Sequence, residues 1–322
     1  MEKSTRILVL VPFCEQHMER IREAAGPQSS VVQCVGPHDE AALHALLDGV
    51  DVVIGEPNPA VLAKAPSVRW VQMTWAGTDL YTRNAVPFPT GMRLTNVAGS
   101  AYGHIISQYV LAQVLSIAHN LPSYIRQESQ ALWKGAGSVM TLEGTRALVF
   151  GAGDIGSCTA CHLTHFGVEC VGICRNVSQP RAGFTHLVTL DQAETMLPSS
   201  DIVVCCLPSS TETDGYLNER RLRLMKDASI LVNVGRGRFV DCDALAQVLA
   251  EGRLRGAALD VTNPEPLPPA HPLWSEPRCV ITPHVAGKAF GVCPDTENRI
   301  CDVVCENLKR WIAEEPLTHV VI

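Results

Sequence analysis

Residues 147–175 read ALVFGAGDIGSCTACHLTHFGVECVGICR, and this stretch decides the fold. An apolar run leads into a turn that holds Gly151, Gly153 and Gly156, and a second apolar run closes the stretch. The glycines of a GxGxxG turn permit a tight bend, a close backbone approach to a pyrophosphate, and close packing of a helix on a strand. The helix that follows presents unpaired N–H groups and the positive end of its dipole to phosphates. We therefore predict a strand, turn and helix that bind a dinucleotide.

The end of the second apolar run bears on which dinucleotide is bound. NAD-binding units usually carry an acidic residue there for the adenosine ribose hydroxyls, but this chain has Cys174 followed by Arg175. A carboxylate would repel a 2′-phosphate, whereas a guanidinium can bind one through charge-assisted hydrogen bonds. The sequence therefore favours NADP(H). The alternative is that Arg175 is a solvated loop residue and that the protein accepts either NADP(H) or NAD(H) as its cofactor.

The composition is that of an ordinary globular protein. The 322 residues suffice for two domains, and 46% of them are hydrophobic and 18% charged. The net charge of −7 gives no reason to expect nucleic acid or an anionic membrane as a partner. No apolar run reaches the roughly 18 residues of a membrane span. The first short apolar run lacks a small-residue cleavage site, so we expect a cytoplasmic protein.

The chain has thirteen cysteines, an odd number, and we expect reduced and mostly buried thiols. Residues 158–162 match the CxxCH pattern of covalent haem attachment, but they fall on the helix expected after the glycine turn. A zinc site built from Cys158, Cys161, His162 and His165 is possible by residue type only. We therefore expect cysteines of the core or of helix faces, and no metal.

The pattern along the chain predicts strands that alternate with helices. In the first part, which lacks a nucleotide fingerprint, the expected strands are 6–11, 31–35, 51–54, 69–73 and 93–94, with helices over 39–47 and 60–64. A long helix is expected over 101–119. The middle part predicts a parallel sheet with helical crossovers, its strands being 147–150, 168–174, 186–188, 201–206, 229–234, 256–261 and 279–282. An amphipathic helix is expected over 293–311.

Three blocks after the glycine turn carry residues suited to chemistry. They are ILVNVGRG at 230–237 with Arg236, ALDVTNPEPLP at 258–268 with Glu265, and CVITPHVAG at 279–287 with His284. Ligands of open α/β sheets bind at the carboxyl ends of strands, and the arginine fork suits bidentate binding of a carboxylate. Each residue alone could be a surface arginine, a solvated glutamate or a structural histidine. Because all three follow strands of one sheet, we expect a shared site.

With these motifs, the chain resembles the D-isomer-specific 2-hydroxyacid dehydrogenases, in their glyoxylate/hydroxypyruvate reductase-like branch, from about residue 70 to residue 287. The resemblance implies NAD(P)H-dependent reduction of a 2-oxo acid to the D-2-hydroxy acid, and the reverse reaction. It implies that Arg236 binds and polarises the 2-oxo acid, that His284 is the general acid, and that Glu265 holds and tunes His284. Elementary chemistry agrees, because hydride addition leaves negative charge on oxygen that needs a cation and a proton donor.

The resemblance implies further contacts. Ala76 and Gly77 would bind the substrate carboxylate through their backbone N–H groups, with Trp75 as a wall of the pocket; the alternative is a packed turn with a buried tryptophan. Asp260 would contact the nicotinamide carboxamide. The full set of expected cofactor contacts is Gly151, Gly153, Asp154, Ile155, Gly156, Cys174, Arg175, Leu207, Pro208, Val234, Asp260, His284 and Gly287.

Pattern and resemblance together predict a two-lobed α/β protein. A dinucleotide-binding domain of residues 99–289 would have a Rossmann-type, doubly wound parallel sheet. A smaller flavodoxin-like α/β substrate domain would comprise residues 1–98 and 290–322. The resemblance also implies a homodimer that acts on a small 2-oxo or 2-hydroxy acid.

Two other functions remain open. A phosphoglycerate dehydrogenase-like enzyme would typically prefer NAD and often carries an extra regulatory domain, for which this chain is too short. A corepressor-like scaffold of the same fold would use nucleotide binding to assemble with partners, and could keep the same arginine, glutamate and histidine. Oxidation of NADPH or NADH by a panel of 2-oxo acids would separate an enzyme from a binding protein.

Overall fold

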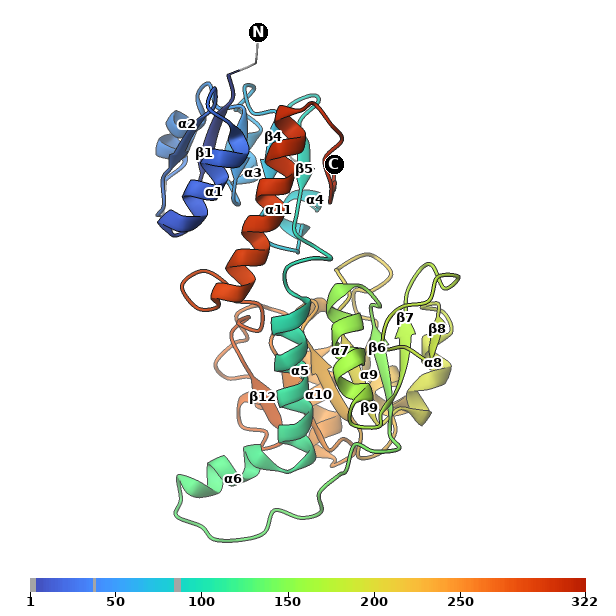
Figure 1. Ribbon diagram of the computed structural model, residues 1–322. Helices are drawn as coiled ribbons and strands as arrows, with labels where there is room; N and C mark the ends of the chain where they lie inside the picture. The colour runs from blue at the N-terminus through green and yellow to red at the C-terminus, as the bar shows by residue number, and fades with distance from the viewer. Residues whose placement is uncertain (1–3, 37–38, 84–87) are drawn as a thin grey trace. The chain divides into compact units, whose positions relative to one another are not determined.

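A computed structural model describes residues 4–36, 39–83 and 88–322 of the chain. The chain divides into two compact units (Figure 1). The first unit is Met1–Tyr102 with Lys288–Ile322, and the second is Gly103–Gly287. Each unit is built on a parallel sheet with helices on both faces, so the predicted α/β fold class is confirmed.

Among its described residues, the first unit has a five-stranded sheet in the order β2-β1-β3-β4-β5. Its strands are β1 (Arg6–Val9), β2 (Ser30–Gln33), β3 (Val52–Ile54), β4 (Trp70–Gln72) and β5 (Arg93–Thr95). This is the order of flavodoxin-like sheets, in which the chain reverses direction across the sheet between β1 and β3. Ligands of such sheets bind at the carboxyl ends of the strands beside that reversal.

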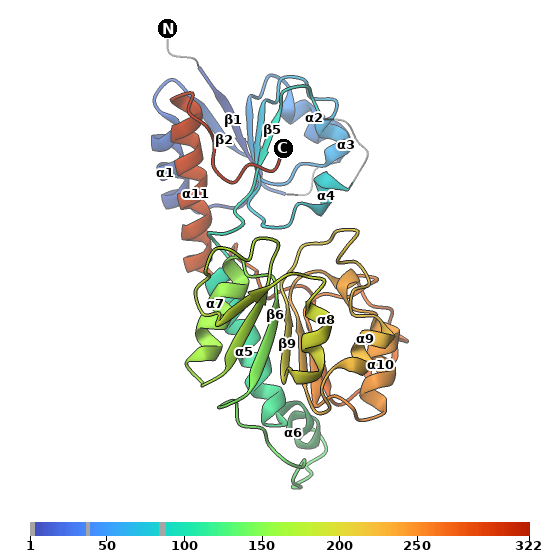
Figure 2. The same cartoon turned by 90° about the vertical axis from the view of Figure 1, so that its right-hand side faces the viewer.

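Helices cover both faces of the first sheet. In Figure 2, α1 (Glu15–Ala25) and α11 (Pro294–Ile312) lie on one side, and α2 (Glu40–Leu47), α3 (Pro59–Leu62) and α4 (Asp79–Thr82) lie on the other. The apolar stripe of α11, which includes the buried Ile300, Val304 and Leu308, faces inward. Buried Asn307 donates to Oε1 of Gln72 at 2.8 Å, which fastens the last helix of the chain to β4.

The second unit has a seven-stranded sheet in the order β12-β11-β10-β9-β6-β7-β8. The strands are β6 (Arg146–Phe150), β7 (Glu169–Ile173), β8 (His186–Val188), β9 (Ile202–Cys205), β10 (Ile230–Asn233), β11 (Gly256–Leu259) and β12 (Cys279–Ile281). The chain starts in the middle at β6, runs outward to β8, and returns across β6 to β9. This is the doubly wound Rossmann order, with its reversal between β6 and β9.

The strands of the second sheet are buried on both faces. Every residue of β9, β10 and β11 is buried, as expected for parallel strands covered on two sides. One face carries α5 (Gly103–Ala118) and α7 (Asp154–Thr164), and the other carries α8 (Ala193–Met196), α9 (Glu219–Leu224) and α10 (Cys242–Ala250) (Figure 2). The remaining elements are α6 (Leu121–Glu128) and the 3₁₀ turns η1 (Leu197–Ser199), η2 (Gly237–Phe239) and η3 (Pro272–Trp274).

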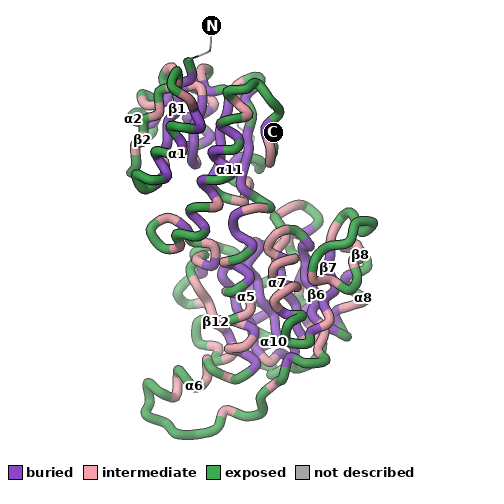
Figure 3. Tube along the Cα trace, in the orientation of Figure 1, coloured by how far each residue is buried: buried purple, intermediate pink, exposed green. Residues whose placement is uncertain are grey.

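Figure 3 shows the buried residues gathered along the strands and the inward faces of the helices, with α6 and the segment after it exposed. Several helices begin where a side chain caps the first turn. Asp39 before α2 accepts the N–H of Ala42 at 2.7 Å, and Asp241 before α10 accepts that of Ala244 at 3.0 Å. In the described part of the chain, we find no helix with both the length and the apolar character that crossing a membrane requires.

Candidate active site

The glycine turn joins β6 to α7, as the sequence indicated. Gly151 has a φ of +107°, which favours glycine. A Cβ on Gly156 would lie 1.8 Å from the carbonyl oxygen of Gly151, so only glycine lets the helix pack on the turn. A Cβ on Gly153 would meet nothing within 4 Å. The open space at Gly153 adjoins the first N–H groups of α7, which have no partner within the helix, and this arrangement fits a phosphate group.

Asp154 and Ile155 form the first turn of α7. The Asp154 carboxylate accepts the backbone N–H of Gly103 at 2.9 Å, so it caps the start of α5. The side chain of Asp154 is thereby committed to the fold. What this residue can offer a phosphate is its backbone N–H.

The end of β7 lies against the glycine turn, because the carbonyl of Ile173 accepts the N–H groups of both Gly151 and Ala152. Cys174 follows, and its thiol donates to the carbonyl of Asn176 at 3.2 Å. Arg175 is exposed and forms no ion pair with any residue that the structure describes. The end of this strand thus offers a guanidinium and no carboxylate.

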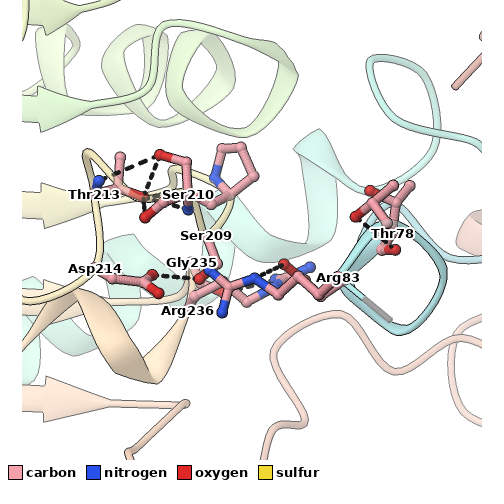
Figure 4. Close-up of polar contacts among 11 residues, drawn as sticks. Thr78, Arg83, Ser209, Ser210, Thr213, Asp214, Gly235 and Arg236 are labelled. Atoms are coloured by element: carbon pink, nitrogen blue, oxygen red, sulfur yellow. Dashed lines mark hydrogen bonds and ion pairs between the residues drawn. The ribbon is translucent and has the colours of Figure 1, made fainter. Parts of the chain in front are cut away.

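The loop after β9 begins with Leu207 and Pro208. Thr213 stabilises this loop. The Thr213 hydroxyl donates to the carbonyl of Pro208 at 2.9 Å and accepts the N–H of Ser210 at 2.8 Å. Figure 4 shows this contact, together with the hydrogen bond from Ser209 to Asp214, beside Arg236. These hydrogen bonds stabilise the loop next to the end of β10.

Arg236 follows β10, and a buried amide shapes its loop. Asn233 accepts the N–H of Gly235 at 3.1 Å and donates to the carbonyl of Arg236 at 3.0 Å. The Arg236 guanidinium donates through Nη1 to the carbonyl of Gly235 at 2.7 Å (Figure 4). Val234, expected to contact the cofactor, is buried. The loop thus presents a half-buried arginine at the carboxyl end of a central strand.

His284 and Glu265 form a close pair, with Nδ1 of the ring 2.7 Å from Oε1 of the carboxylate. Their side chains are 51% and 44% exposed. Because an ionised carboxylate can only accept, Nδ1 carries a proton in this contact. Within the described residues, Nε2 has no hydrogen-bonding partner. Nε2 is therefore the ring atom that can exchange a proton with a ligand.

Asp260 fixes the backbone on which His284 lies. This carboxylate is only 3% exposed. Oδ1 accepts the Thr282 hydroxyl at 2.6 Å and the N–H of Val285 at 2.9 Å, and Oδ2 accepts the N–H of Ala286 at 2.9 Å. The carboxylate thus binds donors on both sides of His284, a positioning role that sequence reasoning did not assign to it.

Tyr109 of α5 extends this contact. Its hydroxyl lies 2.6 Å from that of Thr282. Burial raises the pKa of Tyr109 to about 12, so the phenol keeps its proton and can donate to Thr282. The chain from Tyr109 through Thr282 to Asp260 joins a covering helix to the loop of His284.

The structure brings Arg236, Glu265 and His284 to the same edge of one sheet. They follow β10, β11 and β12, which are neighbouring parallel strands. At the usual strand spacing, the outer two strand ends lie about 10 Å apart. Gly287 follows shortly after His284, at the end of the second unit.

In the first unit, the loop after β4 is shaped by Glu56, a residue that sequence reasoning missed. Oε1 of Glu56 accepts the N–H of Thr74 at 2.6 Å, the Thr74 hydroxyl at 3.0 Å and the N–H of Trp75 at 3.1 Å. Burial raises the pKa of Glu56 to about 6, although these hydrogen bonds act in the opposite direction.

The next two residues of this loop have spare donors. Within the described part of the chain, the N–H groups of Ala76 and Gly77 meet no acceptor. The amide of Asn96 donates to the carbonyl of Ala76 at 2.9 Å, which orients the loop. Trp75 is 53% exposed, so the alternative of a buried tryptophan is wrong.

A cavity of about 580 Å³ opens at the carboxyl edge of the first sheet. It adjoins the ends of β1 and β3, where the strand order reverses. Its lining is largely apolar and includes Leu10, Val11, Glu56, Pro57, Trp75 and Leu80.

No group of three or more histidine, cysteine or acidic side chains in the described ranges is arranged to hold a metal ion. Cys158 and Cys161, considered from the sequence as haem or zinc ligands, lie on α7.

Comparison with known proteins places these features in a family. Residues 111–286, more than half of the chain, match the family described as "D-isomer specific 2-hydroxyacid dehydrogenase, NAD binding domain". The chain belongs to the D-isomer specific 2-hydroxyacid dehydrogenase family. Its members are NAD(P)-dependent oxidoreductases of small 2-oxo and 2-hydroxy acids, and the resemblance seen in the sequence is thereby confirmed.

Several relatives align with most of the chain. Glyoxylate/hydroxypyruvate reductase A of Serratia proteamaculans is 30% identical over 238 residues, which are 73% of this chain and 75% of the relative. A crystal structure of a D-isomer specific 2-hydroxyacid dehydrogenase family protein from Aeromonas salmonicida is 30% identical and matches with a TM-score of 0.84 over 99% of both chains. The dehydrogenase from Xanthobacter autotrophicus Py2, solved with NADPH and MES, is 25% identical with a TM-score of 0.80 over 99% of this chain and 98% of that one.

Proposed function

We propose that this dehydrogenase reduces a 2-oxo acid to the D-2-hydroxy acid with hydride from NADPH, and catalyses the reverse oxidation. The observation that carries the proposal is the 2.7 Å contact between His284 and Glu265, at the sheet edge that also presents Arg236. A proton donor with a fixed tautomer beside a cation is what reduction of a carbonyl requires of a protein.

The glycine turn is the proposed site of the cofactor. Gly151, Gly153 and Gly156 would admit the pyrophosphate to the first N–H groups of α7, including those of Asp154 and Ile155. Further contacts would come from Leu207 and Pro208 after β9, from Val234 and Asp260, and from His284 and Gly287. The cofactor, when bound, supplies the hydride and accepts it back in the reverse direction.

Arg175 and Cys174 underlie the preference for NADP(H). The end of β7 carries no carboxylate, and Arg175 is exposed and forms no ion pair among the described residues. A guanidinium in this place can bind a 2′-phosphate through charge-assisted hydrogen bonds. The Xanthobacter relative was solved with NADPH, which supports the same preference.

The proposed chemistry uses three side chains of the second unit. Arg236 binds the 2-oxo acid and polarises its carbonyl. His284 donates the proton on Nε2 to the carbonyl oxygen as negative charge develops there, and takes it back in the oxidation. Glu265 keeps the proton on Nδ1 and stabilises the imidazolium form.

The loop of the first unit is the proposed site for the substrate carboxylate. The unused N–H groups of Ala76 and Gly77 are donors of the kind that bind a carboxylate. Trp75, which is exposed and lines the cavity of this unit, would be a wall for the substrate side chain. In this proposal, residues 1–98 and 290–322 form the substrate domain, residues 99–289 form the cofactor domain, and the enzyme is a homodimer.

The test is a kinetic comparison of NADPH and NADH with glyoxylate, hydroxypyruvate, pyruvate, and branched and aromatic 2-oxo acids. We expect oxidation of NADPH by at least one of them and a product of D configuration by chiral chromatography. His284→Asn should lower turnover far more than it weakens NADPH binding. If NADPH binds but no 2-oxo acid is reduced, the chain is a nucleotide-binding scaffold and the proposal is wrong.

Arg175→Asp tests the choice of cofactor separately. We expect a rise of at least 10-fold in KM for NADPH, since a favourable charge contact becomes a repulsive one, and no rise in KM for NADH. An equal change for both cofactors would contradict the assignment of Arg175 to the 2′-phosphate.

A further inference from the structure

Cys14 lies at the start of α1 and is not among the residues assigned to the reductase. All thirteen cysteines fall within the described residues, and Cys14 alone among them is exposed. Its side chain makes no capping hydrogen bond to the helix. Its sulfur lies instead 3.4 Å from Nδ1 of His17, one helical turn along.

His17 is oriented so that it can accept the thiol proton. The ring is 5% exposed, and its Nε2 lies 2.8 Å from Oδ1 of Asn298 on α11. An amide oxygen can only accept a hydrogen bond, so Nε2 carries the N–H in this contact. In the neutral ring, Nδ1 then has its lone pair directed to the Cys14 thiol.

The groups packed around this pair favour its charged form. Oε2 of buried Glu297 lies 3.9 Å from His17 Nδ1 and stabilises an imidazolium there. The other oxygen of Glu297 accepts the N–H of Gly291 at 2.6 Å, which holds the carboxylate in place. The positive end of the α1 dipole favours a thiolate on Cys14.

The other polar and aromatic neighbours of the pair come from α1, α11 and the loops before them. The rings of Phe13 and Phe290 pack on one another, and Phe13 packs edge-on to His17. The thiol of Cys301 faces the His17 carbonyl at 3.9 Å. Arg20 is paired with Asp302, so that its charge is largely compensated. Of the charged groups named here, Glu297 is the one that lies within 4 Å of the histidine ring.

We propose that Cys14 is a nucleophilic thiol and a site of modification by small electrophiles, with His17 as its base and Asn298 orienting that base. A nucleophile, a base and a group that holds the base are the parts by which enzymes activate a thiol. The assignment is independent of the proposed reductase activity, because none of these residues belongs to the glycine turn, to the Trp75 loop or to the strand ends of the second unit.

The chemistry can be written for two electrophiles. His17 Nδ1 takes the thiol proton, and the thiolate attacks the methylene carbon of iodoacetamide, forming an S–C bond as the C–I bond breaks and iodide leaves. With hydrogen peroxide, the sulfur attacks one oxygen and the O–O bond breaks. The sulfur is oxidised to a sulfenic acid, and the departing hydroxide takes the proton from the His17 imidazolium to give water.

The chain contains a matched control thiol. Cys174 is partly exposed, and its thiol donates to the carbonyl of Asn176 at 3.2 Å. A carbonyl oxygen cannot remove the proton, so Cys174 should react as a thiol without a base. Both cysteines can be followed in one sample of the full-length protein.

The experiment is alkylation by iodoacetamide from pH 6 to pH 9, with the rate at each cysteine measured by peptide mass spectrometry. We expect Cys14 to react at least 10-fold faster than Cys174 at pH 6.5, and the rate at Cys14 to depend less steeply on pH than the rate at Cys174. If the rate at Cys14 rises with pH as steeply as that at Cys174, the proposal is wrong. This comparison needs no variant.

His17→Gln and Asn298→Ala then test the two supporting residues, each folded variant being checked by circular dichroism. His17→Gln should make Cys14 as slow and as pH-dependent as Cys174, and Asn298→Ala should have a smaller effect in the same direction. Trapping with dimedone after brief exposure to hydrogen peroxide should label Cys14 and not Cys174. An unchanged alkylation rate in a folded His17→Gln variant would overturn the assignment of the base.

Discussion

The carbonyl oxygen of Asp260 accepts the backbone N–H of His284 at 2.8 Å, and His284 has a φ of +54°. Residues other than glycine rarely adopt this left-handed conformation, so the surrounding structure must hold it. The Asp260 carboxylate does so by accepting the next two N–H groups, from Val285 and Ala286. The position of the proposed general acid therefore depends on a buried carboxylate at the end of the neighbouring strand.

Replacing Asp260 should consequently impair both stability and turnover. Asp260→Ala leaves two buried N–H groups and the Thr282 hydroxyl without their acceptor, and we expect a loss of roughly 3 kcal/mol in the free energy of unfolding. Because His284 would no longer be held in place, kcat should fall about 100-fold. Urea unfolding and steady-state kinetics would measure the two effects.

Thr282→Val is the matched control for Asp260. It removes one hydroxyl from the contact and leaves the bonds to Val285 and Ala286 in place, so the loss should be about 1 kcal/mol. A folded Asp260→Ala variant with unaltered kcat would contradict the positioning role.

Glu265→Gln should shift the pH dependence of the reaction. Glutamine can still accept from Nδ1 of His284 but carries no charge, so the imidazolium loses the carboxylate that stabilises it. The protonated acid needed for reduction would then be lost at lower pH, and the profile of kcat/KM for reduction should move toward lower pH. Glu219→Gln, at an exposed carboxylate of α9 paired with Arg223, controls for the change in net charge. An unmoved profile in Glu265→Gln would exclude the proposed role.

Two glycines of the same turn should respond differently to alanine. A methyl group on Gly153 meets nothing within 4 Å, so Gly153→Ala should fold normally and yet weaken cofactor binding at least 10-fold, if the pyrophosphate lies there. A methyl group on Gly156 would lie 1.8 Å from a carbonyl oxygen, so Gly156→Ala should destabilise the second unit itself. Isothermal calorimetry with NADPH and thermal unfolding would separate these outcomes. Unchanged affinity in Gly153→Ala would place the cofactor elsewhere.

The strands could be predicted because a parallel sheet buries short apolar runs on both faces. The run at 186–188 coincides with β8, and that at 201–206 contains β9. The motif residues were also visible, because ligands bind where such strands end. The helix α6 was not predicted: its apolar stripe of Leu121, Tyr124 and Ile125 is short and exposed, and none of its residues is buried.

The supporting contacts could not be predicted, because their partners are far apart in the sequence. Tyr109 and Thr282 are separated by 173 residues, and His17 and Asn298 by 281. Glu56 is a single acidic residue after an apolar strand, a position at which most carboxylates are solvated. Of these contacts, the one between Cys14 and His17 could be inferred from the sequence, because residues three apart on a helix lie on the same face.

Glu56 leads to a prediction about stability and pH. Its pKa of about 6 in the folded protein exceeds the ordinary value of 4.5, so the folded state binds more protons than the unfolded state between these two values. The contribution of Glu56 to the free energy of unfolding therefore falls as the pH rises through this window, by about 2 kcal/mol in all at about 1.4 kcal/mol per pH unit.

The variant Glu56→Gln tests this prediction, because glutamine keeps an acceptor for the N–H groups of Thr74 and Trp75 but does not titrate. Relative to the wild type, this variant should become more stable by about 2 kcal/mol between pH 4.5 and pH 7.5, as measured by urea unfolding. The control is Glu40→Gln, because the side chain of Glu40 is exposed. If the difference in stability between Glu56→Gln and the wild type stays constant over this pH range, burial does not destabilise the Glu56 carboxylate.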